Sequence, residues 1–108
     1  MREFVCHWRE EEGVDVIAFA GAIGSRSATL FGAVLEALSQ SPTRDLRIDC
    51  DRVTFMASAS VGQLVKLVND VRGRGGRVTL EPLPVHLSEL FRRMRLETFL
   101  GADPDRSR

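Results

Sequence analysis

The chain has 108 residues, enough for one domain with its own hydrophobic core. Its 44% hydrophobic and 28% charged residues are typical of a soluble globular protein. Fifteen basic residues balance fifteen acidic ones, and this zero net charge argues against a general nucleic-acid binder, which carries a basic excess. No signal sequence opens the chain and its apolar runs are too short to span a membrane, so we expect a cytoplasmic protein without membrane insertion. The two cysteines, Cys6 and Cys50, are expected to be reduced thiols.

Alternating residues near the N-terminus predict an antiparallel hairpin. Residues 3–9 form the first expected strand, Glu10–Gly13 the turn, and residues 14–20 a second strand that is apolar on both faces in its second half. Because such a strand is buried on both sides, we expect it near the centre of a sheet. Residues 21–25 indicate a loop, in which Ser25 or Ser27 can cap the helix that follows.

The rest of the chain alternates helices with strands. Apolar stripes that recur every three or four residues predict helices over residues 28–39, 58–72 and 85–95. Strands are expected over residues 46–50 and 77–81. Residues 51–56 indicate a short apolar loop, and we expect its Phe55 and Met56 in the core. The glycines of residues 73–76 can supply a left-handed C-cap for the second helix.

The predicted order is β-β-α-β-α-β-α, which is an α/β fold. Strands that alternate with helices need crossover connections, so we expect a mixed, mostly parallel sheet with helices packed on it. Residues 96–100 are compatible with a short terminal strand or with an apolar turn. A single domain is expected over residues 1–101, followed by a flexible tail over residues 102–108.

Ser58 and Ser60 stand where the central helix is expected to start. Serine is a preferred N-cap residue because its hydroxyl oxygen accepts from the unpaired N–H groups of the first helical turn. The same N–H groups and the aligned peptide dipoles favour negative charge at a helix start. Each serine can therefore be a plain cap or a hydroxyl that is reversibly phosphorylated, and the residues alone leave both readings open.

The residues do not indicate an enzyme or a metal site. Residues 73–76 are glycine-rich but follow a helix and precede a strand, the reverse of the order in phosphate-binding loops. His7 and His86 are remote in sequence and no nucleophile motif surrounds either. Successive side chains of a strand point to opposite faces, which argues against a cation held by the run Asp49-Cys50-Asp51. We therefore expect no catalysis, no metal and no cofactor.

Four blocks of the sequence resemble the STAS domain family, and within it the single-domain anti-sigma-factor antagonists of bacteria. The main block, Leu46–Gly62, is similar to the family pattern hydrophobic-D-hydrophobic-x-x-V-x-F-hydrophobic-D-S-S-G-hydrophobic-G. Val16–Gly24 resembles the second strand with its L-x-G-x-L-D exit. Arg74–Leu80 resembles the R-G-G-x-hydrophobic entry to the next strand, and Pro84–Phe99 the last helix. The blocks occur in the family's order and span most of the chain.

The chain departs from the family at the D-S-S-G motif. Where the family has an aspartate before the phosphorylated serine, this chain has Ala57. The second serine of the motif is Ala59 here, its glycine is Ser60, and the aspartate of the earlier loop is Gly24. The resemblance therefore leaves Ser58 as the regulatory position, without the neighbouring carboxylate that lies at the kinase interface in family members.

The resemblance implies a regulatory binding domain. The unmodified form would dock an ATP-dependent serine kinase that is also an anti-sigma factor, and phosphorylation of Ser58, with Ser60 as the weaker candidate, would switch the docking. The partner would hold the nucleotide. Candidate docking residues are Gly24, Ser25, Ala57, Ser58, Ala59, Ser60 and Gln63.

Three hypotheses stay open at this point. The first is the switched anti-sigma-factor antagonist. The second is a divergent STAS scaffold that docks a partner without switching, which Ala57 and Ala59 favour. The third is a STAS subunit of a lipid or sulphate transport complex. No direct contact with nucleic acid is expected, and a homodimer is left open.

Overall fold

The computed structural model of the protein describes residues 4–41, 45–96 and 99. Strands β1 (Val5–Glu11) and β2 (Val14–Ile23) come first, followed by a short 3-10 turn (Ser25–Ser27) and helix α1 (Ala28–Ser39). Strand β3 (Asp45–Met56), helix α2 (Ser58–Gly73), strand β4 (Val78–Leu80) and helix α3 (Val85–Arg93) complete the order. The predicted α/β order is thereby confirmed; the expected terminal element at residues 96–100 and the tail at 102–108 fall largely or wholly outside the described residues.

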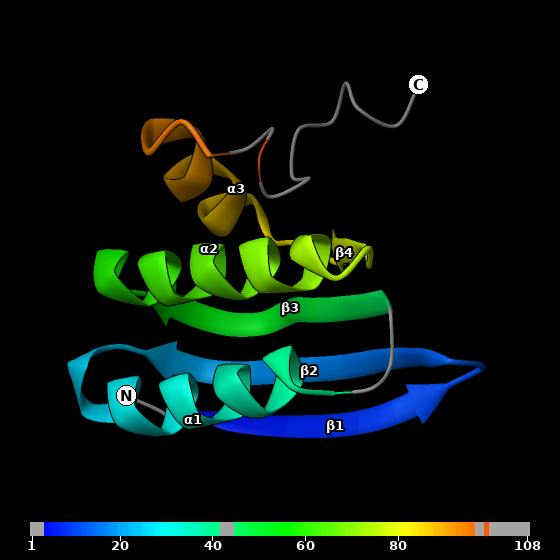
Figure 1. The fold of residues 1–108 in the computed structure, drawn as a ribbon. Coiled ribbons are helices and arrows are strands. Elements are labelled where there is room, and N and C mark those ends of the chain that lie inside the picture. Colours follow the sequence, from blue (N-terminus) through cyan, green and yellow to red (C-terminus); the bar gives the residue numbers. More distant parts are fainter. Residues whose placement is uncertain (1–3, 42–44, 97–98, 100–108) are drawn as a thin grey trace.

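The four strands form one mixed sheet in the order β1-β2-β3-β4. β1 pairs antiparallel with β2, whereas β2 with β3 and β3 with β4 are parallel pairs. Helices α1 and α2 pack against each other on one face of the sheet, and α3 lies on the far side of α2 from α1 (Figure 1). Parallel strands joined by helices place the carboxyl ends of β2 and β3 at the same end of the sheet.

The hydrophobic core lies between this sheet face and the helices. Its centre includes three aromatic rings, since Phe31 of α1 meets both Phe4 and Phe19 edge to face. On α2 the predicted stripe faces the core, with Val61, Leu64, Val68 and Val71 almost fully buried. The periodicity of the sequence therefore located both the helices and the faces they bury.

The two N-terminal strands are longer than the alternation predicted. β1 continues through Glu10 and Glu11, so the hairpin turn narrows to Glu12 and Gly13, both with positive φ. β2 runs to Ile23, which contradicts the loop expected from residue 21 onward. The extra residues of β1 pair with β2 across the hairpin, whereas residues 21–23 of β2 pair with β3, so the backbone groups of both extensions are satisfied.

β3 is also longer than expected, because residues 51–56 continue the strand and do not form a loop. The pairing with β2 passes through two register shifts and then resumes up to the pair of Ile23 with Met56. At the first shift the Asp49 carboxylate accepts a hydrogen bond from the Asp51 backbone N–H at 2.9 Å. Such bulges bend a strand and allow it to continue where a regular ladder would end.

The end of α2 has the predicted glycine cap. The helix ends at Gly73, and Gly75 adopts a φ of 84°. The N–H of Gly75 donates to the carbonyl of Arg72, and the N–H of Gly76 donates to the carbonyl of Val71. This is the Schellman arrangement, which needs a residue with positive φ and explains the glycine at position 75. The other predicted bounds shift slightly, since α3 ends at Arg93 and β4 covers residues 78–80.

Candidate functional site

The candidate site is the end of the sheet where β2 and β3 terminate and α2 begins (Figure 1). Ile23 and Met56 are partners in the last register of these strands. One residue further on, the backbone N–H of Ala57 donates to the carbonyl of Ile23 at 2.8 Å. These contacts hold the segment after β2, residues 24–27, beside the first residues of α2, residues 57–60. We call these two segments the switch edge.

The first segment of the switch edge is a tight turn fastened by one serine. The hydroxyl oxygen of Ser27 accepts from the Gly24 N–H at 3.1 Å and lies 3.3 Å from the carbonyl oxygens of Ala22 and Gly24. Ser27 occupies the N-cap position of α1 but makes no side-chain cap bond to that helix. Ser27 therefore stands at the expected cap position, but its hydroxyl holds the preceding turn and does not cap α1, and Ser25 lies inside the 3-10 turn.

The start of α2 differs from the prediction in the same way. The N-cap residue is Ala57, with φ −71° and ψ 152°, and no side chain caps the helix. Ser58 is the first residue inside the helix and is exposed, while Ser60 is 1% exposed. Of the two alternatives left open for these serines, capping of α2 is wrong, because Ser58 lies one residue and Ser60 three residues after the N-cap position. Ser58 thus has no capping role that would compete with modification of its hydroxyl.

Gln63 lies apart from the other candidate docking residues. Its side-chain Nε2 donates to the carbonyl of Ala28 at 3.3 Å, so it ties the start of α1 to the second turn of α2. Its Oε1 is buried without a hydrogen-bond partner, and a Cβ on Gly32 would lie 2.8 Å from its Nε2. Gln63 is therefore a contact between helices, whereas Gly24, Ser25 and residues 57–60 share the switch edge.

Phe55 is a residue of this region that the sequence prediction placed wrongly. Its side chain is 47% exposed, whereas that of Met56 is 3% exposed. The ring lies against Gly24, with its Cε2 3.5 Å from the position of a Cβ on that glycine. Strand alternation puts neighbouring side chains on opposite faces, so an extended β3 with Met56 in the core places Phe55 outside. Recognising the longer strand would have been enough to find it.

The switch edge contains a single charged side chain, Arg26. Gly24 and Ala57, where the resemblance leads one to expect aspartate, carry no charge. The first turn of α2 has no acidic residue either. The unmodified switch edge therefore combines hydroxyl groups with one positive charge, and the exposed ring of Phe55 lies beside it.

Comparison with known proteins identifies the family. A family model described as "Mlab, STAS domain" matches residues 6–101, nearly the whole chain. The chain belongs to the STAS domain family. No relative was found among curated protein sequences.

Solved structures with the same fold include anti-sigma factor antagonists. An anti-sigma factor antagonist from Mycobacterium paratuberculosis matches with a TM-score of 0.66 and 21% identity, over 84% of this chain and 82% of that one. The Bacillus cell fate determinant SpoIIAA in its phosphorylated form gives a TM-score of 0.66 and 20% identity, over 87% and 86% of the two chains. The STAS domain of an antagonist from Rhodobacter sphaeroides gives 0.61 and 19%, over 71% and 84%. At these identities the likeness establishes the STAS fold.

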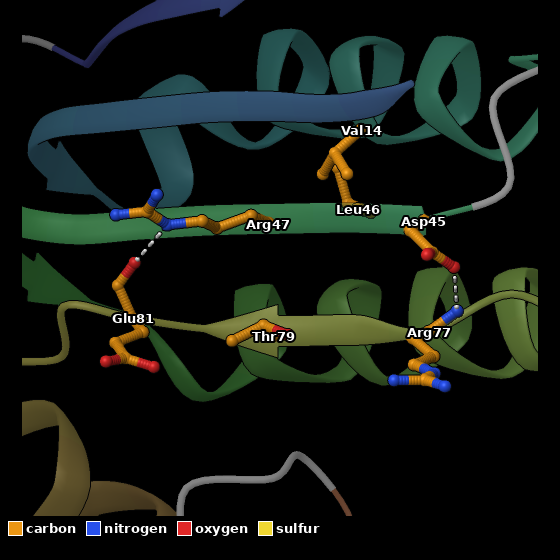
Figure 2. A pocket seen from close by; sticks show the side chains of 7 residues that line it. All are labelled: Val14, Asp45, Leu46, Arg47, Arg77, Thr79 and Glu81. Carbon is orange, nitrogen blue, oxygen red and sulfur yellow. Dashed lines mark hydrogen bonds between the residues drawn. The ribbon is translucent and has the colours of Figure 1, made fainter. Parts of the chain in front are cut away.

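A second surface feature of this STAS domain is a hollow at the opposite end of the sheet, where β3 begins. It has a volume of about 450 Å³ and is lined by Val14, Asp45, Leu46, Arg47, Arg77, Thr79 and Glu81. Arg47 Nε donates to the Glu81 carbonyl, and the Arg77 backbone N–H donates to the Asp45 carboxylate (Figure 2). Two guanidinium and two carboxylate groups line the hollow and lie apart around it, so its charges balance and do not converge on one ligand.

The remaining reactive groups of the STAS domain are dispersed. Both cysteines are free; burial and the charge of Asp49 raise the pKa of Cys50 to about 12, and burial also raises the pKa of Cys6. Over residues 4–41, 45–96 and 99, no three histidine, cysteine or acidic side chains lie together as metal ligands would. Within the same residues, no helix has the length and apolar character needed to cross a bilayer.

Proposed function

We propose that this STAS domain is an anti-sigma-factor-antagonist-like regulator that docks a serine-kinase anti-sigma factor through the switch edge. Phosphorylation of Ser58 is the switch. The observation that carries the proposal is the exposed hydroxyl of Ser58 at the first residue of α2, beside the turn of residues 24–27. The chain itself performs no chemistry in this scheme, and it acts in the cytoplasm.

Two features of the site support Ser58 as the acceptor. A kinase must reach the hydroxyl, and Ser58 is exposed whereas Ser60 is 1% exposed. The fold must also tolerate the product. Phosphate adds about −1.5 to −2 charges, and the uncapped N–H groups at the start of α2 favour negative charge by about 0.3–1 kcal/mol. SpoIIAA, which has the same fold, is known in both phosphorylated and unphosphorylated forms.

The modification would act on the partner more than on the fold. A charge of that size, enclosed in an interface without a counter-charge, costs several kcal/mol. Every 1.4 kcal/mol of lost binding free energy raises the dissociation constant tenfold, so the affinity falls by orders of magnitude. The exposed ring of Phe55 supplies apolar area next to the same edge, and aromatic side chains are frequent anchors of protein interfaces. A domain without an active site can in this way carry a binary signal.

The test is a kinase assay with purified serine-kinase anti-sigma factors from the organism that encodes the chain. Each is incubated with the protein and ATP, and the modified residue is mapped by mass spectrometry. We expect phosphate on Ser58, none on Ser60, and none in a Ser58→Ala variant. A kinase that binds the protein tightly but leaves Ser58 unmodified would contradict the switch and support the scaffold hypothesis. Co-purification with a membrane transport complex in place of any kinase would support the transport hypothesis.

A further inference from the structure

Arg26 is the feature of the switch edge that the proposed function does not use. It lies in the 3-10 turn that follows β2, and it is exposed. In the part of the chain that the structure describes, its guanidinium group has no ion-pair partner. No acidic residue occurs on either segment of the switch edge, so the charge of Arg26 is not compensated locally.

The backbone joins the segment that contains Arg26 to the segment that contains Ser58. The two segments are joined at Ile23 and Ala57, and neighbouring strands lie about 4.8 Å apart. A 3-10 turn rises only about 2 Å per residue, so Arg26 stays near the end of β2. The hydroxyl of Ser27 fastens this turn to Ala22 and Gly24, which fixes the position of the Arg26 backbone.

A contact between α1 and α2 also joins the two elements that follow the segments of the switch edge. Gln63 Nε2 donates to the carbonyl of Ala28. Ala28 lies two residues after Arg26, and Gln63 lies five residues after Ser58 on α2. The helices that follow the two segments of the switch edge are therefore joined to each other as well. The planar guanidinium group of arginine matches the geometry of a phosphate, which makes Arg26 the cation of this edge that suits a phosphate group on Ser58.

We propose that Arg26 is the internal counter-cation of phosphorylated Ser58. The inference rests on the proposed function for its biological meaning, because it concerns the modified state of the same serine. Guanidinium groups bind phosphate through paired hydrogen bonds, so the modified serine would be held against the turn of residues 24–27. Modification then removes the free positive charge of Arg26 from the edge as well as adding the negative charge of the phosphate.

The test measures the second ionisation of the phosphate. Phosphoserine is installed at position 58 during translation, so the result does not depend on any kinase. ³¹P NMR titrations then compare the otherwise native protein with Arg26→Gln and Arg26→Lys. Arg77→Gln is the matched control: it removes the same charge from an exposed arginine at the hollow, at the other end of the sheet (Figure 2).

A nearby cation favours the dianion and lowers the phosphate pKa from its usual value of about 6. We therefore expect Arg26→Gln to raise it by about 0.5 units, Arg26→Lys to raise it less, and Arg77→Gln to leave it unchanged. Equal values for Arg26→Gln and Arg77→Gln would overturn the proposal. If the phosphate pKa behaves as expected but no kinase modifies Ser58, the pairing stands and only the proposed function fails.

Discussion

The uncapped start of α2 can be tested by giving it a cap. Ala57 already has the extended φ and ψ of an N-cap residue, but its methyl group cannot accept a hydrogen bond. The backbone N–H groups of Ser60 and Val61 both donate to the Ala57 carbonyl, at 2.9 and 3.1 Å. The N–H of Ala59, at the second position of the helix, is within reach of an acceptor on residue 57. Ala57→Asp supplies that acceptor and restores the residue type of the family.

The expected gain follows from two contributions. A side-chain cap is worth about 1 kcal/mol, and a negative charge at the helix start adds about 0.3–1 kcal/mol. Ala57→Asp should therefore raise the free energy of unfolding by about 1.5 kcal/mol, and Ala57→Ser by about 1 kcal/mol. In a domain of roughly this size each kcal/mol moves the melting temperature by about 4–8 °C.

Urea unfolding at neutral pH measures these changes as shifts in midpoint at constant slope. Ala59→Asp is the matched control, because a charge at the second helical position interacts with the dipole but does not cap. Ser58→Ala should change stability by less than about 0.5 kcal/mol, since Ser58 makes no cap bond. If Ala57→Asp is no more stable than Ala59→Asp, the N-terminus of α2 is not uncapped as the structure has it.

Three further predictions concern packing and the thiols. Gly32→Ala should change stability by less than about 1 kcal/mol in thermal unfolding, because the gain in helix propensity is offset by moving Gln63 Nε2 away from the Ala28 carbonyl. A loss of more than about 1 kcal/mol would show that this contact cannot shift. Phe31→Ala should lower the free energy of unfolding in urea by about 3–5 kcal/mol, because the Phe31 ring is fully buried. Phe55→Ala should lower it clearly less, because the Phe55 ring is half-exposed, and equal losses for the two variants would contradict this difference in burial. Folding raises the pKa of Cys50 from 9.0 to about 12, so the folded state keeps the thiol proton to higher pH than the unfolded state does. The free energy of unfolding that depends on this thiol should therefore be fully present below pH 9 and be lost as the pH rises toward 12. Urea unfolding of Cys50→Ala over the same pH range should show a smaller decrease, and an equal decrease would contradict the raised pKa.

The sequence predicted the helices and the sheet because those depend on local periodicity. The stripe on α2 and the glycine at position 75 each follow from a pattern within a few residues, and both are observed. The family resemblance identified the STAS fold, which the family match over residues 6–101 confirms.

The site was harder to predict because its details depend on contacts between distant segments. β3 continues beyond Cys50 only because β2 extends to meet it, and this pairing turns Phe55 outward. The cap of α2 was assigned to a serine on residue preference, yet the bond from the Ala57 N–H to Ile23 fixes where the helix begins. Arg26 could not be linked to Ser58 from the sequence, because the link depends on the bond between Ala57 and Ile23, which are distant in the chain.

The central claim is that one exposed hydroxyl at the switch edge controls the affinity for a docked partner. The most direct measurement is the dissociation constant of the serine kinase that modifies the protein, determined for the unmodified chain and for the chain with phosphoserine at position 58. The account predicts that the phosphorylated form binds at least about 100-fold more weakly while its melting temperature stays the same or rises. Equal affinities for the two forms would contradict it.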